Sequence, residues 1–154
     1  GCASVRHFKM FQDLPYGETE NDWDKIPKLK PLWKEWRRVL KPRGVMLFTC
    51  KMKLAIALIT SNPSWYKYDI VWQKTNATGH LNANKQPLRA HEQMLVFYHK
   101  QPTYNPIKSK GHRRVVSTAK HKRNSNKSTN YNDYNWTDYD STERFPTSVW
   151  SLMM

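Results

Sequence analysis

The chain has 154 residues, which is the size of one domain. Its 26 Lys and Arg residues against 12 Asp and Glu residues give a formal charge of +14, so the expected partner is a polyanion. Only two cysteines occur, no Cys/His cluster has zinc-ligand spacing, and no apolar run approaches the ~20 residues of a membrane span. The composition argues against a disulfide framework, a structural zinc site and a membrane protein, and it predicts a cytoplasmic location.

Positive charge alone is shared by ribosomal proteins, membrane-surface proteins and heparin binders. The aromatic content narrows the choice, because seven Trp, eight Tyr and five Phe residues are interspersed among the basic ones. Such rings can stack on bases while Lys and Arg contact phosphates. The alternative is that most of them fill a small core.

Apolar patterning along the chain predicts an alternation of strands and helices. A weak apolar patch in residues 1–12 is interpreted as a strand that delivers Asp13 at its carboxyl end, and residues 18–30 as a loop anchored by Trp23. The other expected elements are a helix at 31–40 that the run 41–44 stops, a strand at 45–49 covered on both faces, a helix at 54–60, and strands at 66–75 and 94–99. This order predicts an α/β fold with a mixed sheet whose last two strands form an antiparallel hairpin.

The most informative stretch for chemistry is Asp13-Leu14-Pro15-Tyr16, followed by Gly17. An exocyclic amine on a nucleobase is a poor nucleophile because its lone pair is delocalised into the ring, and two hydrogen-bond acceptors can pull it towards tetrahedral geometry. Asp13 offers a carboxylate oxygen, Pro15 or Leu14 offers a backbone carbonyl, and Tyr16 offers a face on which an extruded base can stack. Taken alone, these five residues are more commonly an ordinary surface turn.

A polar, amide-rich segment, residues 72–92, connects the last two expected strands. Lys74, Lys85 and Arg89 are candidate phosphate contacts, and amide side chains such as Asn82 can read base edges, adenine especially. The alternative is a merely solvated hairpin loop.

A basic arm follows at residues 102–130, which contain no acidic residue. The expected contacts to the DNA backbone in this arm are Arg113, Arg114, Lys120 and Arg123. Residues 131–140 are acidic and aromatic, and we expect them to fold back on the arm.

Together these motifs resemble the amino-group DNA methyltransferases, in which an Asp-Pro-Pro-Tyr tetrapeptide holds the target amine. Asp13, Pro15 and Tyr16 match that tetrapeptide, and Leu14 departs from it. An acidic first residue implies adenine N6 as the target, where a serine would imply cytosine N4. The elements Trp72-Gln73-Lys74 and His91-Glu92 resemble the phage and prophage branch of the adenine enzymes, which adds His91 to the DNA-binding candidates. The resemblance covers residues 13–106 and 140–150.

The resemblance implies a Rossmann-like sheet, S-adenosylmethionine as cofactor and double-stranded DNA as substrate. It assigns residues 1–106 to the catalytic half of the domain, 107–140 to a DNA-recognition insertion, and 141–154 to a return to the core. Two family elements do not occur in this sequence, a His-Pro-Thr-X-Lys-Pro segment and the glycine-rich Phe-X-Gly-X-Gly turn that holds the cofactor. The expectation is therefore a truncated enzyme that binds cofactor weakly by itself. Cofactor-binding residues stay unassigned, with Asp13 as a candidate.

Two further expectations follow from the missing elements. Residues 50–53 replace a Gln-Pro-Phe type of turn, so the local geometry there should differ from that of the family. The strand before Asp13 should lie at an open sheet edge, and a homodimer formed through residues 5–11, together with 149–154, would cover it.

Three functions are compatible with these residues. The first is a DNA adenine-N6 methyltransferase, which the resemblance favours as the family. The second is a catalytically inactive relative that still binds DNA. The third is a basic RNA-binding or ribosome-associated domain in which Asp13-Leu14-Pro15-Tyr16 is coincidental.

Overall fold

A computed structural model describes residues 7–118 and 138–151 of the chain. The chain divides into two compact units, Gly1–Tyr104 with Ser148–Met154 and Asn105–Thr147, and each is described by itself. No helix in the described residues is long and apolar enough to cross a membrane. The roles expected for residues 1–106, 107–140 and 141–154 stay a prediction.

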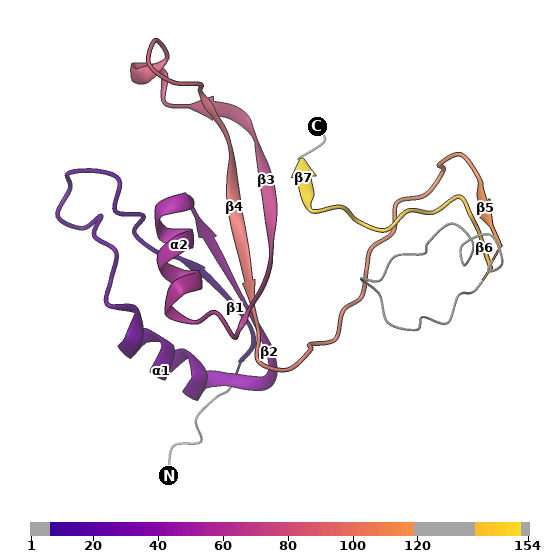
Figure 1. Ribbon diagram of the computed structural model, residues 1–154, viewed down its shortest axis with the longest axis horizontal. Coiled ribbons are helices and arrows are strands. Elements are labelled where there is room, and N and C mark those ends of the chain that lie inside the picture. The colour runs from indigo at the N-terminus through magenta and orange to yellow at the C-terminus, as the bar shows by residue number, and fades with distance from the viewer. Residues whose placement is uncertain (1–6, 119–137, 152–154) are drawn as a thin grey trace, which may run out of the picture. The chain divides into compact units, whose positions relative to one another are not determined.

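The first unit contains a mixed sheet with the strand order β1-β2-β4-β3-β7 (Figure 1). Its strands are β1 (His7–Asp13), β2 (Leu40–Cys50), β3 (Tyr66–Thr78), β4 (Arg89–Phe97) and β7 (Val149–Ser151). β1 pairs parallel with β2, and β7 pairs parallel with β3, while β4 is antiparallel to both of its neighbours. The predicted α/β fold, the mixed sheet and the antiparallel hairpin are confirmed, and β1 lies at one edge of the described sheet.

Two helices cover one face of this sheet, α1 (Leu29–Val39) and α2 (Met52–Ser61) (Figure 1). Both predicted helices are present, and each begins two residues earlier than predicted. In α1, Trp33 and Trp36 lie three residues apart and therefore on one face, where both are buried against Phe48. α1 ends at Val39, close to the predicted end, but residues 41–44 do not turn the chain away: they lie in β2, where the pairing with β1 is irregular.

The core lies between the helices and the sheet. Met46, Phe48 and Cys50 alternate along β2 and are fully buried there, together with residues of β4 and both helices. The intervening Val45 and Leu47 face away from the helices and pack in a second, smaller cluster, where Leu47 is only partly buried. The expectation that this strand is covered on both faces therefore holds fully on the helix side and only in part on the other side. The helix-free face carries an apolar cavity of about 500 Å³ lined by Phe11, Trp72, Met94, Trp150 and Ser151.

The hairpin of β3 and β4 is longer than predicted. The polar residues at its end continue the ladder, since Thr78 pairs with Arg89 and Gln73 pairs with His91. Only residues 79–88 form the connection, and they include the short 3₁₀ helix η1 (His80–Asn82).

The second unit contains a two-stranded antiparallel sheet of β5 (Val115–Ser117) and β6 (Tyr139–Ser141). Next to it, the Arg114 guanidinium binds the Asp140 carboxylate at 2.5 and 2.7 Å. The expectation that the acidic segment folds back on the basic arm is confirmed at Asp140. Lys120 and Arg123 lie outside the described residues.

Candidate functional site

The site begins at the carboxyl ends of the two parallel strands β1 and β2, which lie side by side. Asp13 closes β1, and Thr49 is its partner in the register with β2. The Thr49 hydroxyl donates a hydrogen bond to Oδ1 of Asp13 at 2.6 Å, and the Tyr16 hydroxyl donates to the same oxygen at 3.1 Å. Asp13 itself is exposed, whereas Thr49 is buried. Two hydroxyl donors from different elements therefore orient one accessible carboxylate.

Tyr16 is half-buried, and its ring packs against the helix-side core. Burial raises the pKa of Tyr16 well above its usual range; the nearby Thr49 hydroxyl acts in the opposite direction, and the carboxylates of Glu92 and Asp13 add to the rise. The hydroxyl therefore stays protonated at neutral pH and remains a donor to Asp13.

A cavity of about 450 Å³ opens at this point. Its lining combines the four residues of the predicted motif with five others, namely Glu18, Thr19, Trp23, Asp24 and Lys51. The volume lies in the usual range for small-ligand pockets, roughly 300 to 1,000 Å³. Three carboxylates, two aromatic rings and one ammonium group thus line this cavity.

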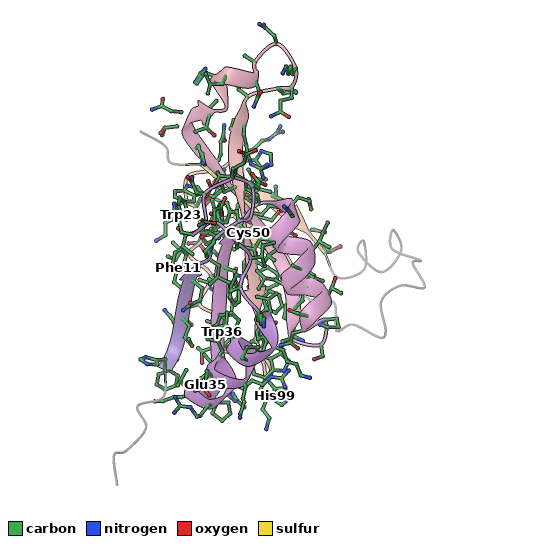
Figure 2. The ribbon with its side chains drawn as sticks, turned by 90° about the vertical axis from the view of Figure 1, so that its left-hand side faces the viewer. Phe11, Trp23, Glu35, Trp36, Cys50 and His99 are labelled. Atoms are coloured by element: carbon green, nitrogen blue, oxygen red, sulfur yellow. The ribbon has the colours of Figure 1, made fainter. Side chains whose placement is uncertain are left out.

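The loop after Tyr16 is anchored differently from the expectation. Trp23 is 71 % exposed, so it is not the anchor, and Figure 2 shows it toward the end of the sheet where Cys50 lies. The neighbouring Asp24 is only 5 % exposed. Its carboxylate accepts hydrogen bonds from the backbone amides of residues 17, 18 and 19, at 2.8, 3.0 and 2.7 Å. These bonds, first among them the one from Gly17, hold the pKa of Asp24 well below its usual range.

Two lysines from the start of α2 add to this anchoring. The Lys51 ammonium pairs with the Glu18 carboxylate at 2.5 Å, and the Lys53 ammonium donates to the Gly17 carbonyl at 2.5 Å. Residues 50–53 were expected to depart from the family turn, and here they bind the loop that follows the motif.

The DNA-binding candidates of the β3–β4 hairpin lie beyond the carboxyl ends of β1 and β2. Cys50, at the end of β2, pairs with Gln93, so the part of the hairpin before Gln93 extends past the edge where Asp13 lies (Figure 1). Arg89 and His91 are in β4, and Asn82 and Lys85 lie in the exposed connection. Lys74 is different, because its ammonium forms an ion pair with Glu92 and both side chains are largely buried.

The remaining DNA-binding candidates lie in the second unit or outside the described residues. Arg114 is paired with Asp140, whereas the Arg113 side chain is exposed and its backbone carbonyl accepts a hydrogen bond from Arg144. Among the described residues, no group of three or more His, Cys, Asp and Glu side chains could hold a metal ion.

Sequence reasoning missed four residues of this site: Thr49, Asp24, Lys51 and Lys53. Thr49 had a usable signal, because it stands near the end of a strong apolar strand that precedes a helix, where parallel strands present ligand-binding groups. Asp24 and the two lysines had none, since their partners are backbone atoms or a loop side chain brought close only by folding.

Solved structures resemble this chain in fold. The crystal structure of the M1.HpyAVI-SAM complex has 18 % identity and a TM-score of 0.50, covering 71 % of this chain and 52 % of its own. The structure of M1.HpyAVI has 17 % identity and a TM-score of 0.45, covering 64 % and 47 %. The chain thus spans about half the length of these structures. No curated protein matches the chain.

A family model described as DNA methylase matches residues 9–152, which is nearly the whole chain and includes the anchored motif, most of β1 and all of β7. The chain therefore belongs to the N6/N4 DNA methylase family.

Proposed function

We propose that this chain carries the target-base site of a DNA adenine-N6 methyltransferase. One observation carries the proposal: the Asp13 carboxylate is oriented by the hydroxyls of Thr49 and Tyr16 at the mouth of a cavity. Both donors bind Oδ1, and no hydrogen bond to Oδ2 is present among the described residues. Oδ2 is thus available to accept a hydrogen bond from an exocyclic amine.

In this proposal, the amine is held by two acceptors. Oδ2 of Asp13 takes one N–H, and the backbone carbonyl of Pro15 or Leu14 takes the other, which draws the nitrogen lone pair out of the ring. The Tyr16 face stacks on the extruded base, and Trp23 lines the same cavity. Adenine is the proposed base because the first residue of the motif is acidic, as in the adenine-specific members that the motif resembles.

The proposed methyl donor is S-adenosylmethionine, the ligand of the similar M1.HpyAVI-SAM complex. The described residues do not fit a complete site for it. Their glycines with positive φ, Gly17, Gly79 and Gly111, stand singly, and no glycine-rich turn approaches Asp13. The cofactor-binding residues therefore stay unassigned apart from the candidate Asp13.

The proposed substrate is double-stranded DNA, bound through the hairpin and the basic arm. The charge of +14 and the projection of the hairpin beyond the Asp13 edge support it. Membership of the phage and prophage branch, the cytoplasmic location and a homodimer stay predictions.

The experiment that tests the base site uses an oligonucleotide with one 5-iodouracil, in a single strand where the base needs no extrusion. Irradiation should cross-link the base to Tyr16, mapped by mass spectrometry of the peptides. Tyr16→Ala should weaken base binding by about 1 to 3 kcal/mol, the usual worth of a base-aromatic stack. Tyr16→Phe keeps the ring and should be milder. Cross-links that avoid this peptide would contradict the proposal.

The second candidate function, an inactive DNA-binding relative, is favoured by the lack of a glycine-rich turn in the described residues. Nucleoside analysis of duplex DNA incubated with the chain and S-adenosylmethionine separates the two. N6-methyladenine that disappears in Asp13→Ala, with DNA affinity retained, supports the methyltransferase. DNA binding without product supports the inactive relative when calorimetric titration shows that the same chain binds S-adenosylmethionine, and N4-methylcytosine would overturn the assignment of adenine.

A further inference from the structure

The placement of Tyr16 requires a constraint that β1 does not supply. β1 ends at Asp13, and residues 14–28 contain neither helix nor strand. Pro15 fixes one backbone angle, and the Tyr16 ring contacts the helix-side core while its hydroxyl binds Asp13. The backbone that follows Tyr16 has no such support from β1, so a further contact is needed to hold it.

Asp24 supplies that constraint. Its Oδ1 accepts from the Gly17 amide, and its Oδ2 accepts from the amides of Glu18 and Thr19. Three consecutive amides converge on one carboxylate because Gly17 has φ +68°, in the left-handed region. A Cβ at Gly17 would also approach Cγ1 of Ile26 to 2.9 Å, so the backbone packs closely there. The first of the three amides belongs to the residue directly after Tyr16.

The acceptor has to be a carboxylate. Three N–H donors point at its two oxygens, and a carboxylate is an acceptor at both. An asparagine would offer one oxygen and one NH₂ group, so either orientation of its amide sets a donor against at least one backbone N–H. Because Asp24 is almost fully buried, water cannot readily replace the lost partner.

We propose that Asp24 is a positioning residue of the base site: by binding the three amides after Tyr16 it fixes the Tyr16 ring where the extruded base stacks. This inference rests on the proposed function, because it assigns Tyr16 to the base. Lys53, which binds the Gly17 carbonyl, and Lys51, which pairs with Glu18, hold the same segment from the side of α2.

The test compares Asp24→Asn with Asp22→Asn in the full chain. Asp22 lies two residues away in the same loop, and its fully exposed carboxylate pairs with Lys25 at 2.9 Å. The two variants remove the same charge, but only the first faces the three amides. Near-UV circular dichroism, to which the buried Trp33 and Trp36 contribute, verifies that the core of each variant is folded.

The first readout is hydrogen exchange of the amides of residues 17–19. In Asp24→Asn they should exchange roughly tenfold faster or more, because hydrogen bonds to a charged acceptor are among the stronger ones. Asp22→Asn should leave the rates unchanged. Unchanged rates in Asp24→Asn would overturn the inference without any bearing on DNA.

The second readout is the cross-link of the 5-iodouracil strand to Tyr16, measured beside the affinity for that strand. Measured at saturating strand, the yield reports the position of the Tyr16 ring in the bound complex and not the affinity. A positioning role predicts a several-fold lower yield in Asp24→Asn, with an affinity loss no larger than that of Tyr16→Ala, and Asp22→Asn like the unmodified chain. Equal yields in both variants would overturn the inference. Failure of the unmodified chain to cross-link at Tyr16 would count against the proposed function, while the exchange rates still decide whether Asp24 holds the segment.

Discussion

At the scale of single residues, the site depends on hydroxyl groups as much as on the carboxylate. Thr49 and Tyr16 come from β2 and from the loop after β1, and both donate to one oxygen of Asp13. This arrangement gives the carboxylate a fixed orientation before any ligand binds. Preorganised groups cost no rearrangement at the moment of reaction.

The coupling between Thr49 and Asp13 can be measured without substrate. Thr49→Val keeps the shape and removes the donor, and Asp13→Ala removes the acceptor. A double-mutant cycle in urea should give a coupling free energy of about 1 kcal/mol, near the usual net value of a hydrogen bond because Asp13 is exposed. Thr49→Ser keeps the hydroxyl and should retain most of the coupling. A coupling near zero would mean that the 2.6 Å contact does not orient Asp13 in solution.

At the scale of elements, the hairpin of β3 and β4 joins the site to the expected DNA contacts. The ion pair of Lys74 with Glu92 links its two strands, and the Glu92 charge contributes to the raised pKa of Tyr16. Lys74 was interpreted as a phosphate contact from its charge and its place in the segment. Its pairing indicates a structural contribution as well.

Removing the Lys74 ammonium should therefore affect stability. In Lys74→Met the Glu92 carboxylate is left largely buried without its partner, and we expect the free energy of unfolding to fall by about 1 to 3 kcal/mol. The matched control is Lys85→Met in the exposed connection, which should change it by less than about 0.5 kcal/mol. Thermal or urea denaturation gives the free energies of unfolding of the two variants. Equal effects would show that the pair contributes nothing.

The elements that the sequence predicted well are those with dense apolar patterns. The run from Val45 to Thr49 and the helical pattern of residues 31–40 required no long-range information. The strand ends at residues 76–78 and 89–93 were missed because backbone pairing extends there without apolar side chains. Helix α1 starts early without any side-chain cap at Lys28, so its beginning had no local signal. Trp23 was mistaken for an anchor because ring size suggests burial, whereas the real anchor, Asp24, depends on amides that only the folded turn aligns.

At the scale of the whole molecule, only some of the basic residues behind the charge of +14 are available to bind phosphates. Several cations are already paired within the protein, among them Lys51, Lys74 and Arg114. Others, such as Lys85 and Arg113, have exposed side chains. The count of basic residues therefore overstates the number that can neutralise phosphates.

A comparison of Arg113 with Arg114 tests whether an arginine unpaired among the described residues contributes more to DNA binding than a paired one. If Arg113 contacts a phosphate, Arg113→Gln should reduce the slope of log affinity against log salt by about 0.9 on duplex DNA. Arg114→Gln should reduce it less, because Asp140 already neutralises that guanidinium. Titrations by fluorescence anisotropy at several salt concentrations give both slopes. The reverse order would show that the Asp140 pair opens on binding.

The buried Cys50 can serve as a chemical probe of how often the sheet opens. Its thiol is fully buried where β2 pairs with β4, and burial raises the pKa of Cys50 to about 12. Alkylating reagents attack the thiolate, so this sulfur is doubly protected while the two strands stay paired. In a chain whose Cys2 is replaced by serine, the rate of alkylation at Cys50 would report how often β2 and β4 separate. The alkylation rate of Cys50 would thus measure the opening of the same sheet that holds Asp13 and Thr49.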